Sequence, residues 1–179
     1  YYMEKSFIAL VEQSIKKNWD LDALTDYKGV TLQYKDVARK IEKIHIILEE
    51  SGVKPGDKIA VCGRNMSHWG VTFLSVVTYG AIIVPILHEF KADQVHNIVN
   101  HSESKLLFVG DVVWESLDES AMPNLEGIIL MNDFSLLISR SDKLTYAREH
   151  LNELFGRKFP KNFRKEHIDY YKERAEELL

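Results

Sequence analysis

Hydrophobic residues in the middle of the chain form short continuous runs separated by more polar, helix-prone stretches. The runs are Lys58–Gly63, Ala81–Leu87, Lys105–Val109 and Gly127–Met131. The stretches between the first three runs predict helices over Ser67–Tyr79, with Ser67 as N-cap, and over Ala92–His101. Continuous apolar strands with crossover helices between them are typical of a parallel sheet covered on both faces. The pattern therefore predicts an α/β fold with a doubly wound, mainly parallel sheet and flanking helices.

Two further helices and a short strand are predicted before this sheet. Hydrophobic side chains recur at three- and four-residue steps at Phe7, Ile8, Val11 and Ile15. A longer helix is expected from about Lys35 to a stop at Gly52, with one apolar face made by Val37, Ile41, Ile44, Ile47 and Leu48. Val30–Tyr34 is β-prone, and residues 18–20 and 26–29 have loop and turn composition.

The chain changes character after Met131. Residues 133–179 are charged and helix-prone, with breaks expected at Gly156 and Pro160. One helix face is predicted from Tyr146, His150, Leu151 and Leu154, and another from Ile168, Tyr171, Ala175 and Leu178. We therefore expect an amino-terminal helix and loop at 1–23, an α/β subdomain at 24–132 and a charged helical tail at 133–179.

Composition excludes several classes of protein. The 179 residues are 45% hydrophobic and 28% charged, which is ordinary for a globular domain and excludes a disordered or collagen-like chain. The net charge of −4 gives no reason to expect a nucleic-acid partner. The single cysteine, Cys62, cannot form an internal disulfide and is expected to be a small core residue.

Hydrophobicity does not predict a membrane span or an export signal. Trp69–Leu87 carries no charge and approaches the length of a span, but its pattern changes at Gly80. A helix followed by a buried strand explains it better. Phe7–Val11 is short and lacks a small-residue cleavage site. We expect a cytoplasmic protein, with peripheral attachment to a membrane left open.

Two loops lie where a doubly wound sheet usually binds ligands, beyond the carboxyl ends of its strands. One is Gly63–Ser67, where a strand, a glycine and a helix start follow one another as an anion-binding turn requires. It lacks the spaced glycines of dinucleotide sites and the Gly-Lys-Ser/Thr of phosphate loops. The alternative is a tight turn in which Asn65 and Ser67 cap the helix. The other loop is His88–Phe90.

Other candidate chemistry has a simple structural explanation. His88, Glu89, Asp93 and His96 match no metal-ligand spacing, so a solvated loop is expected and no metal site is assigned. The basic, aromatic run Arg157–Lys165 could meet a phosphate-bearing partner or an anionic membrane surface. Acidic residues flank it, which favours a solvated turn between helices. The residues alone assemble no nucleophile, base and oxyanion site, so no catalytic, cofactor-binding or metal residue is assigned.

Three segments between Thr31 and Val109 resemble the amino-terminal region of AMP-forming acyl-CoA synthetases, members of the adenylate-forming superfamily. The first is Leu32-Gln33-Tyr34-Lys35-Asp36-Val37, against Leu-Thr/Ser-Tyr-x-Glu-Leu in the family. The second, Gly52-Val53-Lys54-Pro55-Gly56-Asp57-Lys58-Ile59-Ala60, is a nearly full match. The third, Val77-Thr78-Tyr79-Gly80-Ala81-Ile82-Ile83-Val84-Pro85, keeps the glycine-to-proline spacing but not the Lys-Ala before the glycine.

The resemblance implies an enzyme that activates a carboxylate with ATP and transfers the acyl group to CoA, with Mg²⁺ assisting. The family's Ser/Thr/Gly-rich loop, adenine-binding aromatic, ribose-binding aspartate and catalytic lysine have no match here, and the three matched motifs are structural. The resemblance therefore implies the amino-terminal part of one larger adenylation domain of a fatty-acid–CoA ligase, inactive alone and binding none of these cofactors.

Its expected partners are the missing downstream part of the same protein and, in the whole enzyme, a fatty acid. An exposed apolar patch would then favour an artificial homodimer. Two alternatives stay open at this point: a stand-alone module that binds a nucleotide or acyl group at Gly63–Ser67, and a non-catalytic interaction protein.

Overall fold

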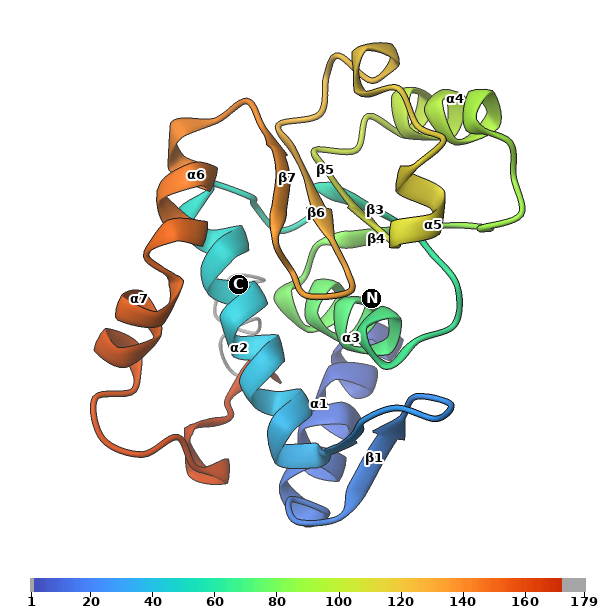
Figure 1. Cartoon of the computed structure of the whole chain (residues 1–179). Helices are drawn as coiled ribbons and strands as arrows, with labels where there is room; N and C mark the ends of the chain where they lie inside the picture. The colour runs from blue at the N-terminus through green and yellow to red at the C-terminus, as the bar shows by residue number, and fades with distance from the viewer. Residues whose placement is uncertain (1, 172–179) are drawn as a thin grey trace.

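A computed structural model describes residues 2–171 and contains a five-stranded sheet with the order β4-β3-β5-β6-β7 (Figure 1). Four strands are parallel: β3 (Lys58–Cys62), β4 (Ile82–Ile86), β5 (Leu106–Val109) and β6 (Gly127–Leu130). The fifth, β7 (Leu136–Ser139), pairs antiparallel with β6. The predicted mainly parallel α/β sheet is confirmed.

Helices connect the parallel strands. α3 (Ser67–Tyr79) leads from β3 to β4, and α4 (Ala92–Ser102) leads from β4 back past β3 to β5. α5 (Asp111–Trp114) and the 3-10 turn η1 (Glu119–Ala121) lie between β5 and β6. The chain thus leaves β3 in one direction and returns to its other side, which is the doubly wound arrangement. All four strand predictions and both crossover helices agree with the structure to within a residue.

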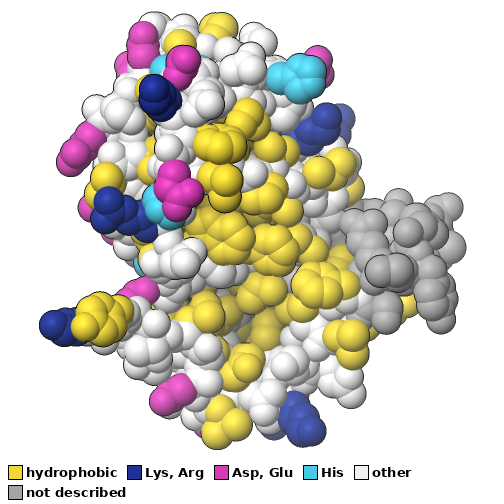
Figure 2. All heavy atoms as spheres, turned by 90° about the vertical axis from the view of Figure 1, so that its right-hand side faces the viewer, with side chains coloured by type: hydrophobic (Ala, Val, Ile, Leu, Met, Phe, Trp, Pro, Cys, Tyr) yellow, Lys and Arg dark blue, Asp and Glu magenta, His cyan; other side chains and the backbone are white. Residues whose placement is uncertain are grey.

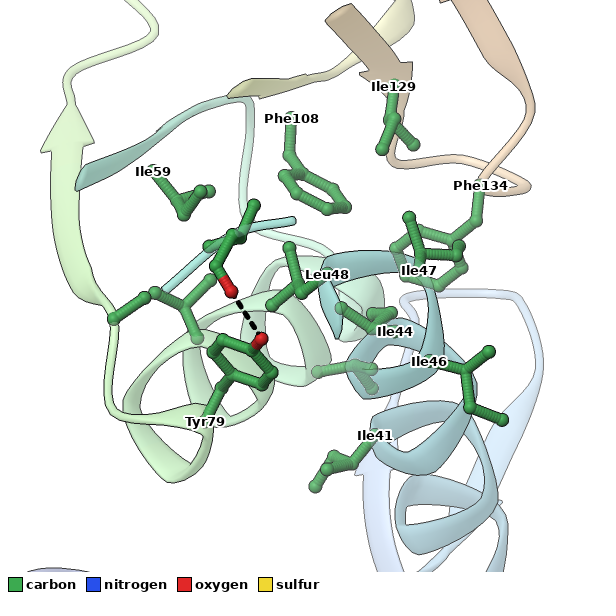
Figure 3. Packing of buried hydrophobic residues seen from close by; sticks show 14 of the residues in the cluster. Ile41, Ile44, Ile46, Ile47, Leu48, Ile59, Tyr79, Phe108, Ile129 and Phe134 are labelled. Atoms are coloured by element: carbon green, nitrogen blue, oxygen red, sulfur yellow. Dashed lines mark hydrogen bonds between the residues drawn. The ribbon is translucent and has the colours of Figure 1, made fainter. Parts of the chain in front are cut away.

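Alternate side chains of the central strands feed two separate cores. Ile59, Val61 and Phe108 face α2 and α3, and Figure 3 shows Ile59 and Phe108 directed toward Leu48 and Ile47 of α2. Ala60, Cys62 and Leu107 face the opposite side, where Val95 and Val99 of α4 cover them. Burial on both faces explains why these strands read as continuous apolar runs rather than as alternating ones.

The amino-terminal part contains α1 (Tyr2–Lys17), a small antiparallel hairpin of β1 (Asp22–Thr25) and β2 (Thr31–Gln33), and α2 (Tyr34–Glu50). The predicted apolar face of α2 is confirmed, since its five residues are all at most 2% exposed. In α1, Ile8 and Ile15 are buried but Phe7 is 41% exposed, so Phe7 does not belong to the buried face. Sequence analysis did not identify β1.

The carboxyl-terminal part corrects two expectations. Leu136–Ser139 is a strand within the segment expected to be helical, because its short apolar run completes the sheet beside β6. α6 (Asp142–Glu149) and α7 (Leu151–Lys158) follow, and α7 continues through Gly156 without a break. A 3-10 turn, η2 (Lys165–His167), lies beyond Pro160. Ala175 and Leu178 of the last predicted face lie outside the described residues.

Among residues 2–171, no helix combines the length and the apolar character that crossing a bilayer requires. Trp69–Leu87 divides into α3 and β4 at Gly80, as expected. The expectation that this strand is buried is wrong, because β4 lies at the edge of the sheet and only Ile86 of its five residues is buried. Gly80 has φ of +90°, a left-handed conformation that ends the helix and starts the turn into the strand.

Candidate functional site

The carboxyl edge of the sheet brings together the loops after β3, β5 and β6. The N–H of Gly110 donates to the Cys62 carbonyl at 3.0 Å, and the N–H of Met131 donates to the Val109 carbonyl at 2.8 Å. A Cβ placed on Gly63 would lie 2.4 Å from the Met131 methyl group and 3.2 Å from the Gly110 nitrogen. A side chain at position 63 would displace the flexible end of Met131 and crowd the Gly110 backbone, so close packing favours a glycine after β3. Met131 fills the position between the strand ends.

The start of α3 is bound by a carboxylate from a distant turn. Asp26 accepts hydrogen bonds from the Ser67 N–H at 2.7 Å and from the Ser67 hydroxyl at 2.8 Å. The N-cap residue is Met66, so the prediction that Asn65 and Ser67 cap this helix is wrong. Asp26 lies 41 residues earlier, in the turn between β1 and β2, and supplies the negative charge that a helix N-terminus favours.

His68, one residue further along α3, is fixed against the end of β6. Its Nδ1 lies 2.5 Å from the Met131 carbonyl oxygen, so this nitrogen carries the proton and donates. Its ring stacks on Phe134 with the centroids 4.4 Å apart. Burial lowers the pKa of His68, and the hydrogen bond to Met131 opposes that shift only in part. The imidazole is therefore neutral at pH 7 and acts as a packing and hydrogen-bonding group.

A polar hollow of about 360 Å³ remains at this edge, and its lining includes Asp26, Asn65, His68 and Asn132. The N–H and hydroxyl of Ser67 that a phosphate would use are already bonded to Asp26. Ser67 contacts the carboxylate directly, without the imidazole that usually activates a serine nucleophile. The arrangement thus holds the β1–β2 hairpin on α3, and it disfavours a phosphate site at Gly63–Ser67.

The second candidate loop does not gather into a site. His88 lies 3.6 Å from the carboxylate of its neighbour Glu89. The Nε2 of His96 accepts the Asp118 N–H at 3.0 Å, at the surface beside η1. In the part of the chain that the structure describes, no three His, Cys, Asp or Glu side chains converge as metal ligands. Burial raises the pKa of the Cys62 thiol to about 11, so it is an unreactive core group.

The basic run at residues 157–165 is partly neutralised by its own surroundings. Arg157 pairs with Glu153 at 2.5 Å, and the Lys158 ammonium lies 3.0 Å from the buried Glu42. Phe159 and Phe163 pack edge to face with ring centroids 4.9 Å apart. The aromatic rings of the basic run therefore pack against each other and do not form a free surface on which a base could stack.

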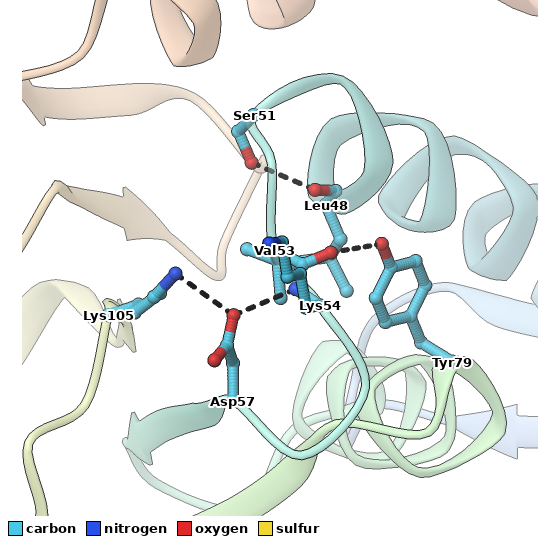
Figure 4. Close-up of polar contacts among 7 residues, drawn as sticks. All are labelled: Leu48, Ser51, Val53, Lys54, Asp57, Tyr79 and Lys105. Atoms are coloured by element: carbon cyan, nitrogen blue, oxygen red, sulfur yellow. Dashed lines mark hydrogen bonds and ion pairs between the residues drawn. The ribbon is translucent and has the colours of Figure 1, made fainter.

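The second and third resemblance motifs meet at the opposite, amino-terminal edge of the sheet (Figure 4). Asp57 accepts the Lys54 N–H at 2.7 Å and pairs with the Lys105 ammonium at 3.0 Å, which joins the start of β3 to the start of β5. The Tyr79 hydroxyl donates to the Val53 carbonyl, so the third motif holds the second. Ligands of doubly wound sheets bind at the carboxyl edge, and this geometry therefore gives both motifs a structural role.

The first motif starts α2. The N–H of Gln33 donates to the Asp36 carboxylate at 2.8 Å, which satisfies an unpaired donor at the helix start. Leu32 is 8% exposed and anchors β2 to the main core. An acidic residue at this place in the motif therefore has a local physical reason.

ATP and Mg²⁺ do not fit the carboxyl edge as the described residues form it. The α3 N-terminus is bonded to Asp26, and the turn after β3 offers a close-packed glycine rather than a cradle of free N–H groups. No step of a reaction is therefore assigned to residues of this edge.

Comparisons of the sequence with known families and with known proteins agree with each other. The sequence profile of the family described as AMP-binding enzyme matches residues 11–161. Fatty acid–[acyl-carrier-protein] ligase ScoC of Streptomyces coeruleorubidus is 30% identical over 84 residues, covering 47% of this chain and 16% of that protein. Long chain acyl-CoA synthetase 1 of Arabidopsis thaliana is 28% identical over 86 residues, covering 48% of this chain and 13% of that protein.

Solved structures show the same fold. A crystal structure of a long-chain-fatty-acid-CoA ligase from Archaeoglobus fulgidus superposes with a TM-score of 0.64 at 17% identity, over 79% of this chain and 29% of that chain. The anthranilate CoA ligase AuaEII with anthranoyl-AMP gives a TM-score of 0.65 at 19% identity, over 71% and 26%. The chain thus spans a small share of the length of the proteins that it matches.

Proposed function

Because the chain belongs to the AMP-binding enzyme family, we propose that it forms the amino-terminal scaffold of an ATP-dependent, AMP-forming fatty-acid–CoA ligase. The observation that carries the proposal is the family match over residues 11–161, which includes all three structural motifs. In the proposed reaction a carboxylate oxygen bonds to the α-phosphorus of ATP and pyrophosphate leaves. The CoA thiolate then bonds to the acyl carbon and AMP leaves.

The fatty-acid part of the proposal is supported by the names of relatives. The Streptomyces and Arabidopsis relatives and the Archaeoglobus structure are all described as acting on fatty or long-chain acyl groups. Others are described as acting on different acids, such as anthranilate and acetate, so substrate choice needs its own measurement.

We also propose that the 179-residue chain is inactive alone. The chain covers 16% of the Streptomyces relative and 13% of the Arabidopsis one. Two of its three motifs organise the amino edge of the sheet and the first starts α2, while Asp26 accepts the hydrogen bonds of Ser67 at the start of α3. ATP, CoA and Mg²⁺ would then be held by residues of the whole ligase other than those described.

Pyrophosphate exchange tests both proposals. The 179-residue chain and the complete polypeptide from the same gene are each supplied with Mg-ATP, labelled pyrophosphate and a panel of short-, medium- and long-chain fatty acids. We expect label in ATP only with the complete polypeptide, and acyl-CoA when CoA is added. Exchange by the 179-residue chain would overturn its proposed inactivity, and a complete polypeptide that is silent with every fatty acid would overturn the substrate class.

The partner that we propose for this scaffold is the remainder of the ligase, packed on the β4 side. Figure 2 shows hydrophobic side chains gathered over the middle of the face that lies on the right in Figure 1. β4 is the edge strand opposite β7, and Ile82 in this strand and Leu87 just after it are 48% and 59% exposed. Exposed apolar area on an edge strand, whose outer side pairs with no other strand of the described sheet, favours association.

A homodimer of the isolated chain would be the artificial form of that contact. We expect sedimentation to give a concentration-dependent dimer, and Ile82→Lys to shift it to monomer, because a charge on an edge strand opposes pairing. A wild-type chain that stays monomeric at every concentration would contradict the prediction of a homodimer.

A further inference from the structure

A cationic groove of about 530 Å³ lies between α2, α6 and the turn that joins β6 to β7. Arg39, Lys40 and Lys43 line it from consecutive turns of α2, and Arg148 lines it from α6. Arg39 and Lys43 are four residues apart and so share one face of the helix. Figure 1 shows α2 beside α6, with the β6–β7 turn near the same helix.

These four positive charges outnumber the negative charges that line the groove, and none of the four forms an ion pair within 4 Å among the described residues. The ion pairs found within 4 Å among the described residues involve other cations, namely Lys16, Lys35, His88, Lys105, Arg157 and Lys158. Two carboxylates line the groove, Asp36 and Asp133, and each already accepts a backbone N–H, from Gln33 at 2.8 Å and from Ser135 at 2.9 Å.

The electrostatic cost is visible at the centre of the cluster. Burial, and then the charges of Arg39, Lys40 and Arg148, lower the pKa of Lys43. An excess of like charge in one place destabilises a folded chain. A bound anion would offset the repulsion among these cations.

Three of the four cations, Arg39, Lys43 and Arg148, are also held in place. The Arg39 guanidinium lies 5.3 Å from the centre of the Phe155 ring, and Lys43 lies 5.5 Å from the same ring. The Nε of Arg148 donates to the Phe134 carbonyl at 2.7 Å, which fixes the guanidinium and leaves its terminal N–H groups for a ligand. Side chains fixed before binding lose less conformational entropy when a ligand arrives.

The floor of the groove is apolar. Ile44, Phe134 and Leu151 line it, and each is at most 9% exposed. A concave volume of a few hundred Å³ with an apolar floor and a few polar groups is typical of small-molecule sites. Arginine forks suit the paired oxygens of a phosphate.

From this geometry we propose that the groove binds the phosphate or polyphosphate group of a small organic molecule, with Arg39, Lys40, Lys43 and Arg148 around the charge and the apolar floor beneath the rest. The proposal does not depend on the proposed ligase function. The same phosphate chemistry occurs in lipid headgroups, but a concave groove favours a soluble molecule over a flat membrane.

Calorimetric titration of the 179-residue chain tests the proposal, with tripolyphosphate and glucose 6-phosphate as probes in buffer without phosphate. The groove variant is the double substitution Lys40→Gln and Lys43→Gln. The matched control, Lys161→Gln with Lys165→Gln, removes the same charge from exposed positions outside the groove. Far-UV circular dichroism checks that both variants are folded.

We expect the wild type and the control to bind, and the groove variant to bind at least about tenfold more weakly, which corresponds to about 1.4 kcal/mol. A rise in the melting temperature on adding tripolyphosphate should likewise be lost only in the groove variant. A wild type that binds neither probe, or equal weakening of binding in both variants, would overturn the proposal.

A third experiment measures binding of the wild type to phosphatidylcholine vesicles with and without phosphatidylserine. Binding to the anionic vesicles alone, with no binding of the soluble probes, would also overturn it, in favour of a membrane surface.

Discussion

Asp26 shows how one side chain can join two distant parts of the chain. It lies in the turn of the β1–β2 hairpin and accepts both hydrogen bonds at the start of α3. A local cap would stabilise only its own helix. Because this cap comes from 41 residues away, it also fixes the hairpin against the main sheet.

Replacing Asp26 by alanine should lower the free energy of unfolding by about 1–2 kcal/mol, as for other lost helix caps. Urea denaturation followed by circular dichroism measures this. Asp20→Ala is the control, because Asp20 is exposed and its pair with Lys35 lies at the surface. Equal stability of Asp26→Ala and the wild type would show that the cap is not formed in solution.

Asp57 makes stability depend on pH. Burial acts to raise the pKa of its carboxyl, but the Lys54 N–H and the Lys105 ammonium outweigh burial, so the pKa is lowered. A folded-state pKa below the unfolded one stabilises the protein above pH about 4, and that contribution is lost as the pH falls through the folded-state pKa.

Asp57→Asn should therefore be less stable than the wild type at neutral pH, and the difference should narrow steadily in acid. Urea unfolding at a series of pH values measures both curves. A difference that stays constant from neutral pH into acid would mean that the charge of Asp57 contributes nothing.

At the scale of elements, the sequence predicts best those that consist of an apolar run between turn residues, and these include β4, which lies at the edge of the sheet and is only partly buried. The ends of β3, α3 and β4 agree with expectation to within a residue, because continuous apolar runs and turn residues mark them. The prediction of helix at residues 136–139, where the structure has β7, was wrong. Three apolar residues inside a charged, helix-prone segment show too little periodicity to indicate a strand. Its strand conformation depends on the neighbouring β6, which local sequence does not show.

Two glycines test the backbone conformation of helix ends directly. Gly52, just after α2, has φ of +85°, whereas Gly156 lies inside α7. At both positions an added Cβ meets nothing within 4 Å, so contacts do not distinguish them.

We expect Gly52→Ala to destabilise the protein by about 1–2 kcal/mol, the cost of a left-handed conformation for an L-residue. Gly156→Ala should stabilise it by about 0.5–1 kcal/mol, because alanine is the better helix former. Thermal and urea unfolding of the two variants give the signs. Shifts in the same direction would contradict the conformations assigned here.

At the scale of the whole molecule, one core joins segments from the full length of the described chain. Ile15 of α1, Ile47 of α2 and Leu144 of α6 belong to the same buried cluster as the strand residues facing them. A shared core of this kind favours one cooperative transition.

Leu144→Ala should therefore lower the midpoint of the entire unfolding curve, at a cost of about 2–5 kcal/mol for a fully buried leucine. Tryptophan fluorescence and far-UV circular dichroism should give coincident curves in the wild type and in the variant. Loss of the carboxyl-terminal helices in a separate, earlier step would show that they form an independent unit.

The sites were much less predictable than the fold. The cap at Ser67 and the groove around Lys43 each combine side chains from elements far apart in sequence. Arg39, Lys40 and Lys43 look like an ordinary solvated helix face until Arg148 is placed opposite them. The pattern of residues along the chain does not indicate which distant side chains come into contact.

The contact between Gly63 and Met131 has a consequence for protein engineering. Doubly wound sheets bind ligands in the crevice beyond the carboxyl ends of their strands. In this protein the methyl group of Met131 packs there against the backbone of Gly63. A nucleotide-binding crevice could be engineered here only after Met131 is replaced by a shorter residue. Longer or more glycine-rich loops alone would leave the Met131 side chain in the space that the nucleotide needs.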